Sequence, residues 1–331
     1  MTDPGPARDD PHEIAIGWRY GVMAYAWWGL VFPFHLKWLT EAAPDGVTEG
    51  GAWWPSEILA HRVLWALIFC FGLLTWLKRW GQLGTALRSR KTLSILLLTA
   101  SLVSVNWLVF IYAVAEGQLY RASLGYFVTP LVNVILGMLF LGERLRGAQW
   151  PAIALAAAGM AWLVLGAGGF PWIELSLAVS FGFYGLVRKK ASVGPIVGLT
   201  VETAVLAPVG VAFLVFLGLG VGPAAGRETG FETGGPLTVT LLVLSGLSTA
   251  LPLLWFAAAA KRLPLVSIGF LQFSAPTGQF LLGVLLFDEV VPDRNWLGYA
   301  LIWAGVSWFA GESYLAARRR RIAIAPGPAP E

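Results

Sequence analysis

The sequence predicts an all-α integral membrane protein with ten transmembrane helices in two inverted five-helix repeats. Three observations lead to this prediction: an apolar composition, the recurrence of long apolar segments, and a similarity between the two halves of the chain. Of the 331 residues, 57% are hydrophobic and 13% are charged, and the mean hydropathy is +0.68. A soluble chain would carry roughly twice that share of charged residues, so the composition excludes a soluble globular protein.

Apolar segments of about 20 residues, the length that a membrane helix needs, recur along the whole chain. Charged residues, glycine and proline separate them, and several separations are so short that consecutive helices must be antiparallel neighbours. The predicted spans cover residues 18–39, 55–78, 92–115, 119–141, 149–167, 171–188, 195–220, 236–260, 264–287 and 294–315. The first five form a repeat over 18–167, and the last five form a repeat over 171–315.

The two ends of the chain are predicted to be cytoplasmic tails. Residues 1–17 lack the cationic start and the small-residue cleavage site of a secretory signal, so the first apolar segment is expected to remain as a span. Residues 316–331 are basic and then rich in proline and alanine, and the last ten are expected to be disordered. The single cysteine, Cys70, lies in an apolar run and is expected to be a buried packing residue.

Lysine and arginine lie mainly on one side of the predicted membrane. With a cytoplasmic N-terminus, 18 of the 23 basic residues fall in inner segments: Arg8, Arg19, Lys78, Arg79, Arg88, Arg90, Lys91, Arg144, Arg146, Arg188, Lys189, Lys190, Lys261, Arg262 and Arg318 to Arg321. Lys37, Arg121, Arg227 and Arg294 fall in outer segments, and Arg62 falls within a span. This bias predicts that both termini are cytoplasmic, and the net charge of +4 then needs no nucleic-acid partner.

The second half of the chain repeats a pattern of the first. Counterparts 146 residues apart are Pro130 and Pro276, Gly137 and Gly283, Glu143 and Glu289, and Trp150 and Trp296. Because each half holds an odd number of spans, the second half enters the membrane upside down relative to the first. Many secondary transporters are built from such inverted repeats, with the site near the midplane between them. The alternative is a chance similarity between apolar helices.

Several segments together resemble one family. They are His61-Arg62 in the second span, NWLVFIYAV (106–114), ASLGYFVTPLVN (122–133), LGERL (141–145), FYGLVRKK (183–190) and VET (201–203). Over about residues 17–316 the chain resembles the RarD-type members of the drug/metabolite transporter superfamily, which have two EamA domains. The resemblance implies a ten-helix transporter of the inner membrane. Relatives export amino acids, metabolites or drugs, so it implies an exporter but no particular substrate. The long outer loop over 40–54 departs from the family pattern.

Polar residues inside the spans are predicted to form an outer cluster. With a rise of about 1.5 Å per residue, they lie roughly 6–10 Å below the outer boundary of the membrane, except Glu57, which is one turn above His61 on the same face. The members are Glu57, His61, Arg62, Asn106, Ser123 and Tyr126. Intramembrane ionisable residues normally face a cavity or a partner. Arg62 is expected to bind substrate or gate the site, and the alternative is a structural pairing with Glu57 or with helix carbonyls. His61 would couple protons or serve as a hydrogen-bonded packing residue.

A second, inner cluster is predicted around Glu202. Glu202 and Thr203 lie about 10 Å from the inner boundary, and Tyr184, Asn133 and Gln272 reach similar depths. Glu202 is the candidate for proton or substrate coupling; the alternative is a carboxylate bonded to span ends. His61 and Glu202 are separated by about 10 Å along the membrane normal, so a direct ion pair between them is not expected.

Two further groups are predicted from their positions. Pro130 and Pro276 occupy matching places in the two repeats, and prolines inside spans create kinks or hinges. The aromatic residues Tyr25, Trp27, Trp28 and Trp107 would line a cavity as a wall for a flat or cationic solute, or would simply pack or contact lipid.

The sequence therefore predicts a secondary transporter of a small amphipathic metabolite or drug, by alternating access and with or without proton coupling. Its partners would be the lipid bilayer and the solute, and it would be a monomer or a homodimer. Nucleotide-loop, metal-ligand and hydrolase motifs are missing, so no cofactor, metal site or enzymatic activity is expected. The alternatives are a lipid scramblase or scaffold and, less favoured, a membrane-embedded enzyme acting on a lipid-linked substrate.

Overall fold

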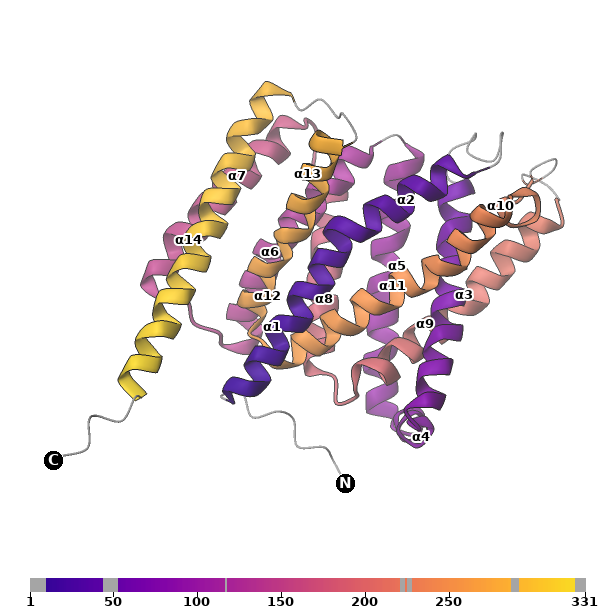
Figure 1. Cartoon of the computed structure of the whole chain (residues 1–331), viewed down its shortest axis with the longest axis horizontal. Helices are drawn as coiled ribbons and strands as arrows, with labels where there is room; N and C mark the ends of the chain where they lie inside the picture. The colour runs from indigo at the N-terminus through magenta and orange to yellow at the C-terminus, as the bar shows by residue number, and fades with distance from the viewer. Residues whose placement is uncertain are drawn as a thin grey trace.

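Helices make up the chain in the computed structural model, and most of the long ones run, at various tilts, between the two ends of one bundle (Figure 1). The structure describes residues 10–43, 53–116, 118–220, 224, 228–286 and 292–324. The elements are α1 (Pro11–Ala26), the π-helical η1 (Trp27–Val31), α2 (Phe32–Glu41), α3 (Trp53–Trp76), α4 (Trp80–Arg88), α5 (Arg90–Ala115), α6 (Leu119–Leu141), the 3₁₀ turn η2 (Gly147–Gln149), α7 (Trp150–Gly166), α8 (Trp172–Lys190), α9 (Pro195–Gly218), α10 (Gly230–Thr233), α11 (Pro236–Arg262), α12 (Leu265–Gln272), α13 (Ser274–Leu286) and α14 (Asp293–Ile324).

Each of the ten predicted apolar segments is helical where the structure describes it. Seven helical segments in the described chain are long and apolar enough to cross a membrane: α3, α5, α6, η2 with α7, α9, α11, and α12 with α13. The chain is therefore an all-α, multi-pass membrane protein. The first helical segment, α8 and α14 fall outside that set of seven.

Several boundaries differ from the prediction. The first helix begins at Pro11, because the side chain of Asp10 accepts a hydrogen bond from the His12 backbone and caps it. The last helix continues to Ile324, so the first part of the predicted C-terminal tail is helical. The predicted ninth span is divided at Phe273 into α12 and α13. Two short helices, α4 and α10, lie in segments that were expected to be loops.

Small residues bring two helices together at one edge of the bundle. A Cβ atom on Gly159 of α7 would lie 2.5 Å from the carbonyl oxygen of Gly298 on α14, and one on Gly305 would lie equally close to that of Ala152. The residue numbers rise along α7 as they fall along α14, so the two helices are antiparallel. Small residues of this kind allow membrane helices to approach closely without a loss of packing.

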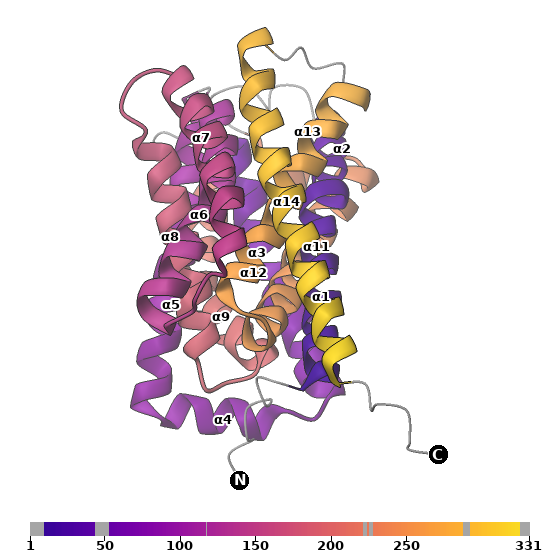
Figure 2. The ribbon, with the colours of Figure 1, turned by 90° about the vertical axis from the view of Figure 1, so that its left-hand side faces the viewer.

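One end of the bundle carries most of the basic residues. Figure 2 shows α4 lying across this end, where the start of α1 and the end of α14 also lie. Lys78 and Arg79 precede α4, Arg88 is its last residue, and Arg90 and Lys91 follow it. Helix α4 has polar and apolar residues, and its Leu83 and Ala86 are buried against the bundle in one cluster with Leu74 and Leu96.

Candidate functional site

Arg62 on α3 lies among side chains from four other helices. Its Nε donates a hydrogen bond to Thr249 Oγ1 of α11 at 2.8 Å. The guanidinium carbon lies 4.9 Å from the ring centroid of Phe32 on α2 and 5.8 Å from that of Trp107 on α5. Tyr126 of α6 is close enough to interact with it electrostatically. The side chain is nevertheless partly exposed.

Aromatic rings continue from Arg62 towards the middle of the bundle. Trp27 Nε1 donates a hydrogen bond to Ser248, the neighbour of Thr249, at 3.2 Å. The Trp27 ring packs edge-on against Trp255 with centroids 5.7 Å apart. Trp28 packs against Phe181 at 6.0 Å in the same manner. These rings are only partly buried, and Trp28, Phe181 and Trp255 pack against a hydrophobic core cluster, so the aromatic wall of a cavity stays a prediction.

Glu57 and His61 face a different part of the structure from Arg62. The Glu57 carboxylate accepts hydrogen bonds from the backbone N–H groups of Gly230 and Phe231, both at 3.1 Å, and so holds the start of α10. His61 stacks on Phe231 with ring centroids 4.9 Å apart, and its Nε2 lies 3.9 Å from Glu57 Oε1. The alternative prediction that Arg62 pairs with Glu57 is therefore wrong: the carboxylate is used by the backbone of α10.

The remaining members of the predicted outer cluster are also divided. The Asn106 side chain donates hydrogen bonds to the Leu177 carbonyl at 3.0 Å and to Ser180 Oγ at 3.1 Å, which ties α5 to α8. Tyr126 alone joins Arg62, and its ring packs against Phe110 with centroids 6.3 Å apart. Ser123 lies one turn before Tyr126 on α6 and is partly buried. The structure thus separates the single predicted cluster into three groups.

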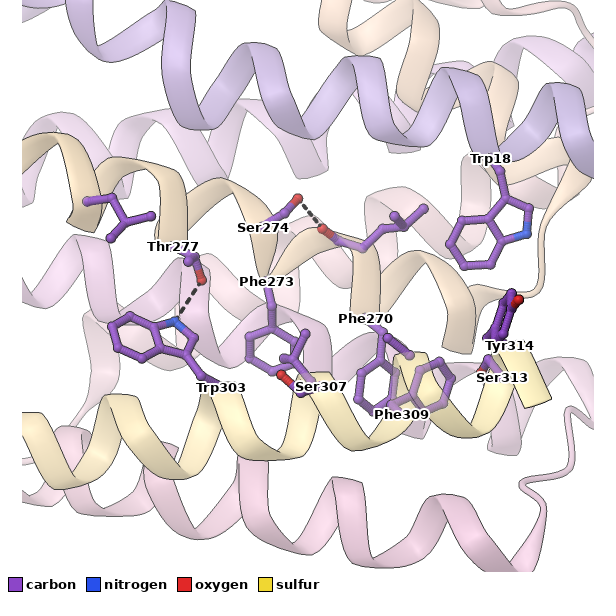
Figure 3. Close-up of a pocket in the computed structure, with 14 residues that line it drawn as sticks. Trp18, Phe270, Phe273, Ser274, Thr277, Trp303, Ser307, Phe309, Ser313 and Tyr314 are labelled. Atoms are coloured by element: carbon purple, nitrogen blue, oxygen red, sulfur yellow. Dashed lines mark hydrogen bonds between the residues drawn. The ribbon is translucent and has the colours of Figure 1, made fainter. Parts of the chain in front are cut away.

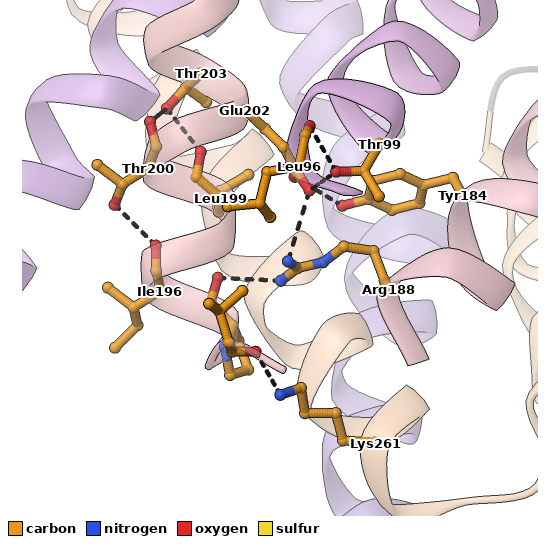
Figure 4. A network of polar contacts seen from close by, with 12 residues as sticks. Leu96, Thr99, Tyr184, Arg188, Ile196, Leu199, Thr200, Glu202, Thr203 and Lys261 are labelled. Atoms are coloured by element: carbon orange, nitrogen blue, oxygen red, sulfur yellow. Dashed lines mark hydrogen bonds and ion pairs between the residues drawn. The ribbon is translucent and has the colours of Figure 1, made fainter. Parts of the chain in front are cut away.

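Glu202 on α9 lies at the centre of a buried polar network (Figure 4). Thr99 of α5 donates a hydrogen bond to Glu202 Oε1 at 2.6 Å, and the Tyr184 hydroxyl of α8 donates one to Oε2 at 3.2 Å. Arg188 Nη1 lies 3.6 Å from Glu202 Oε1 in an ion pair. Only 1% of Arg188 and 2% of Glu202 is exposed, so both charges are removed from solvent and each depends on the other.

Arg188 was not predicted as a site residue. It stands first in the basic run Arg188-Lys189-Lys190, which the sequence assigns to an inner segment. The signal that could have identified it is Gly198: a Cβ atom there would lie 1.8 Å from Arg188 Nη1, so only glycine leaves room for the guanidinium. The Nη2 atom also donates to the Pro195 carbonyl at 3.2 Å, while Nε and Nη1 have no hydrogen-bond partner in the described structure.

Asn133 and Gln272 form a pair of their own. The Asn133 amide donates a hydrogen bond to Gln272 Oε1 at 2.8 Å, and both side chains are buried. They join α6 to α12 where Gly269 approaches the backbone of Pro130. The structure places neither in hydrogen-bond contact with Glu202, so the inner group that it brings together consists of Glu202, Tyr184, Thr99 and Arg188.

The two predicted hinge prolines have different settings. Helix α6 continues through Pro130 without a break. Pro276 stands near the start of α13, just after the interruption at Phe273. Opposite this interruption lies η1, and the Gln279 side chain donates a hydrogen bond to the Trp28 carbonyl at 3.0 Å. A π-helical turn shifts backbone hydrogen bonds out of register, and such turns are frequent at functional sites.

An apolar pocket of about 770 Å³ lies between α1, α12, α13 and α14 (Figure 3). Trp18, Phe273 and Trp303 line it, with Thr277 bonded to the Trp303 indole N–H at 3.2 Å. The pocket contains neither Arg62 nor Glu202, so it is separate from both polar groups. Among the described residues, no group of three or more histidine, cysteine or acidic side chains could hold a metal ion.

Comparison with known proteins identifies the family. Residues 48–165 match the model of the EamA-like transporter family. Protein RarD of Streptomyces exfoliatus is 41% identical over 313 residues, covering 95% of this chain and 94% of that protein. The chain is a RarD-type member of the EamA-like transporter family. This confirms the resemblance predicted from its motifs, and the chain is a membrane transporter of the drug/metabolite type.

A second sequence relative and a solved structure are also similar to this chain. The uncharacterized transporter YojE of Bacillus subtilis is 41% identical over 300 residues, covering 90% of this chain and 94% of that protein. A solved crystal structure with 17% sequence identity superposes with a TM-score of 0.63 and covers 93% of this chain and 98% of that chain. That structure shares the fold, and the sequence relatives carry the family assignment.

Proposed function

We propose that the chain is a secondary transporter of the inner membrane that exports a small amphipathic metabolite or drug by alternating access. The observation that carries this proposal is the setting of Arg62. A partly exposed cation that is enclosed by side chains of α2, α5, α6 and α11 favours an internal site over a lipid-facing surface. Charged groups at membrane depth normally line substrate pathways.

We further propose ten spans in two inverted five-helix repeats. The equivalent helices would be α3 and α9, α6 and α12–α13, and α7 and α14. Support comes from the way these partners pack on each other. Ala60 lies by Gly210, Pro130 lies by Gly269 and Gly159 lies by Gly298, and each of these three pairs of helices is antiparallel. A two-fold axis in the membrane plane brings equivalent helices together in this manner.

In this proposal the basic end of the bundle is cytoplasmic, as are both termini. The basic residues around α4 support this orientation, because positively charged loops are retained on the cytoplasmic side. The Arg188–Glu202 network would then close the inner side of the transport path in the conformation described here. A proton on Glu202 would remove its charge and leave Arg188 without a counterion, which makes Glu202 the candidate for proton coupling.

The test is solute flux in proteoliposomes that contain the purified protein. A panel of radiolabelled aromatic carboxylates, amino acids, nucleosides and neutral drugs would be offered with and without an imposed pH gradient. We expect flux of at least one solute above protein-free vesicles, and its loss in Arg62→Gln. A gradient that accelerates flux in wild type but not in Glu202→Gln would indicate proton coupling.

The same vesicles distinguish the alternatives. A fluorescent phospholipid that exchanges between leaflets, with no solute flux for any member of the panel, would contradict the transporter proposal and favour a scramblase. Chemical conversion of a lipid-linked substrate by the purified protein would favour an enzyme. Flux that is unaffected by the pH gradient would contradict proton coupling and leave facilitated diffusion.

A further inference from the structure

We infer that Arg62 is the anion-binding group of the transport site, and that the solute is a small organic anion with a carboxylate head and a flat apolar body. This inference rests on the proposed transport function, since it names the class of solute that the same site would take. It also changes the expectation from the sequence, in which the aromatic wall suits a flat or cationic solute.

Among the described residues, no negatively charged side chain balances the charge of Arg62. A guanidinium carries five N–H donors. In the described structure the one hydrogen bond that Arg62 donates goes to Thr249, and no carboxylate lies within ion-pair distance of it. The nearest acidic residue on its own helix, Glu57, accepts two backbone hydrogen bonds from α10 instead. A carboxylate solute would supply the missing counterion and accept bonds from the terminal nitrogens.

Arg188 provides a comparison within the same bundle. It is 1% exposed, pairs with Glu202 at 3.6 Å and donates to a backbone carbonyl. The protein therefore neutralises one deeply placed arginine with its own carboxylate and leaves the other partly exposed. Arginine in such a setting suits recognition of a planar carboxylate, because its fork of donors matches two oxygens.

The groups around Arg62 favour the binding of an anionic solute over a cationic one. His35 on α2 and Tyr126 on α6 are the titratable groups that interact with Arg62 electrostatically. Neither is a carboxylate, so no described residue in contact with Arg62 carries a negative charge that would balance an ammonium group. A zwitterionic amino acid would place its ammonium beside this cation without a counterion, and a cationic drug would be repelled.

The aromatic rings near Arg62 suit the flat apolar part of the solute. Phe32 and Trp107 flank the guanidinium at 4.9 and 5.8 Å, and the Trp27–Trp255 pair is joined to the same stretch of α11 through Ser248. Partly exposed rings of this kind offer faces and edges on which a flat ring packs. A carboxylate held by Arg62 would therefore carry its apolar part against these rings.

The experiment measures binding by thermal shift and flux in proteoliposomes with four matched probes. They are phenylacetate, its neutral amide phenylacetamide, the cation phenethylamine, and zwitterionic phenylalanine. We expect phenylacetate to bind wild type at least about 10-fold more tightly than the other three, as loss of a charged hydrogen-bond partner predicts. Arg62→Gln should weaken phenylacetate binding by about 10- to 100-fold, and Arg62→Lys by less. Lys37→Gln is the control, because it removes an exposed cation on neighbouring α2 that pairs with Glu41.

Three outcomes decide between the two proposals. Equal affinity for phenylacetate and phenylacetamide would overturn the anion site, and this comparison in wild type holds even if an Arg62 variant does not fold. Flux of the neutral probe alone would also overturn it while leaving the transport function intact. Binding of phenylacetate that depends on Arg62, without flux, would support the anion site and contradict transport.

Discussion

Two arginines at membrane depth differ in what surrounds them, and this difference assigns them different roles. Arg188 is enclosed with Glu202, Tyr184 and Thr99 in a network in which no residue is more than 2% exposed. Arg62 is partly exposed and is held by one hydroxyl and two aromatic rings. The first arrangement ties α5, α8 and α9 together, whereas the second, in our proposal, presents a charge to a solute.

Replacing Glu202 with glutamine is expected to destabilise the protein. Arg188 would then remain buried without a counterion, which costs about 3–5 kcal/mol. Thermal unfolding in detergent should show a clear decrease in midpoint. The control is Glu41→Gln, because the side chains of Glu41 and its partner Lys37 are 56% and 43% exposed, so about 0–1 kcal/mol is expected. Equal midpoints for the two variants would contradict a stabilising role of the Arg188–Glu202 pair.

Gly198→Ala is expected to break the same network from the other side. The added methyl group would lie 1.8 Å from Arg188 Nη1, so the guanidinium must leave Glu202 or the helices α8 and α9 must separate. We expect a loss of about 2–4 kcal/mol from overpacking and the broken ion pair. Gly72→Ala on α3 is the control, since nothing lies within 4 Å of its added Cβ. A wild-type midpoint for Gly198→Ala would show that Arg188 is not confined as described.

For single residues, the sequence predicted how deep each polar side chain lies in the membrane but not which neighbouring helix it faces. Glu202 and Tyr184 were expected together and are bonded. Glu57, Asn106 and Arg62 were expected at one depth, but they point to α10, α8 and α11. The position of a residue along a helix gives its height in the membrane, whereas its partner depends on which neighbouring helix it faces. A single sequence does not show which helices are neighbours, so it does not show which partner a side chain meets.

Among the elements, two interruptions in otherwise regular helices lie against each other. The π-helical η1 separates α1 from α2, and the break at Phe273 separates α12 from α13. A Cβ atom on Gly29 of η1 would lie 2.9 Å from the Ala275 carbonyl oxygen, and one on Gly278 would lie 3.0 Å from the Gly29 carbonyl oxygen. We propose that this contact between two irregular turns acts as a hinge between the helices during transport.

Gly29→Ala is therefore expected to slow transport and to destabilise the fold. The methyl group would press on the backbone of α13, which cannot rotate away as a side chain can, and overpacking of this kind costs about 1–3 kcal/mol. The measurement is the initial rate of solute flux beside the unfolding midpoint. Gly311→Ala on α14 is the control, because its added Cβ meets nothing within 4 Å. A Gly29→Ala variant with wild-type flux rate and stability would show that this contact does not act as a hinge.

The helices themselves were largely predictable, and the irregular elements were not. Apolar runs of sufficient length gave the segments from α3 to α13 within a few residues, because a backbone in lipid must satisfy its own hydrogen bonds. The turn η1 depends on a contact from Gln279 to the Trp28 carbonyl, 251 residues away in sequence. Helix α10 depends on Glu57 in the same manner. Glu289, the repeat counterpart of Glu143, lies outside the described residues. Glu143 itself accepts hydrogen bonds from the first backbone N–H groups of α12.

For the whole molecule, the number of spans depends most on α8. Composition alone gives seven crossing helices in the described chain, and α8 is not among them. Its charged residues nevertheless have partners inside the bundle: Glu174 is fully buried against Arg121 at 2.7 Å, and Arg188 is paired with Glu202. Charges that are paired internally lower the hydropathy of a helix without exposing it to lipid, so a helix of this kind can cross a membrane.

Cysteine labelling of intact spheroplasts tests both the ten spans and their orientation. The native Cys70 is fully buried and should give no background. We expect a membrane-impermeant maleimide to label Phe170→Cys and Gly235→Cys directly, and to label Gln82→Cys and Ser192→Cys only after permeabilisation, because positively charged loops stay in the cytoplasm. Positions 170 and 192 flank α8, so labelling of both from the same side would exclude α8 as a span and with it the inverted repeat. Labelling of all four with sides exchanged would keep the ten spans and reverse the orientation.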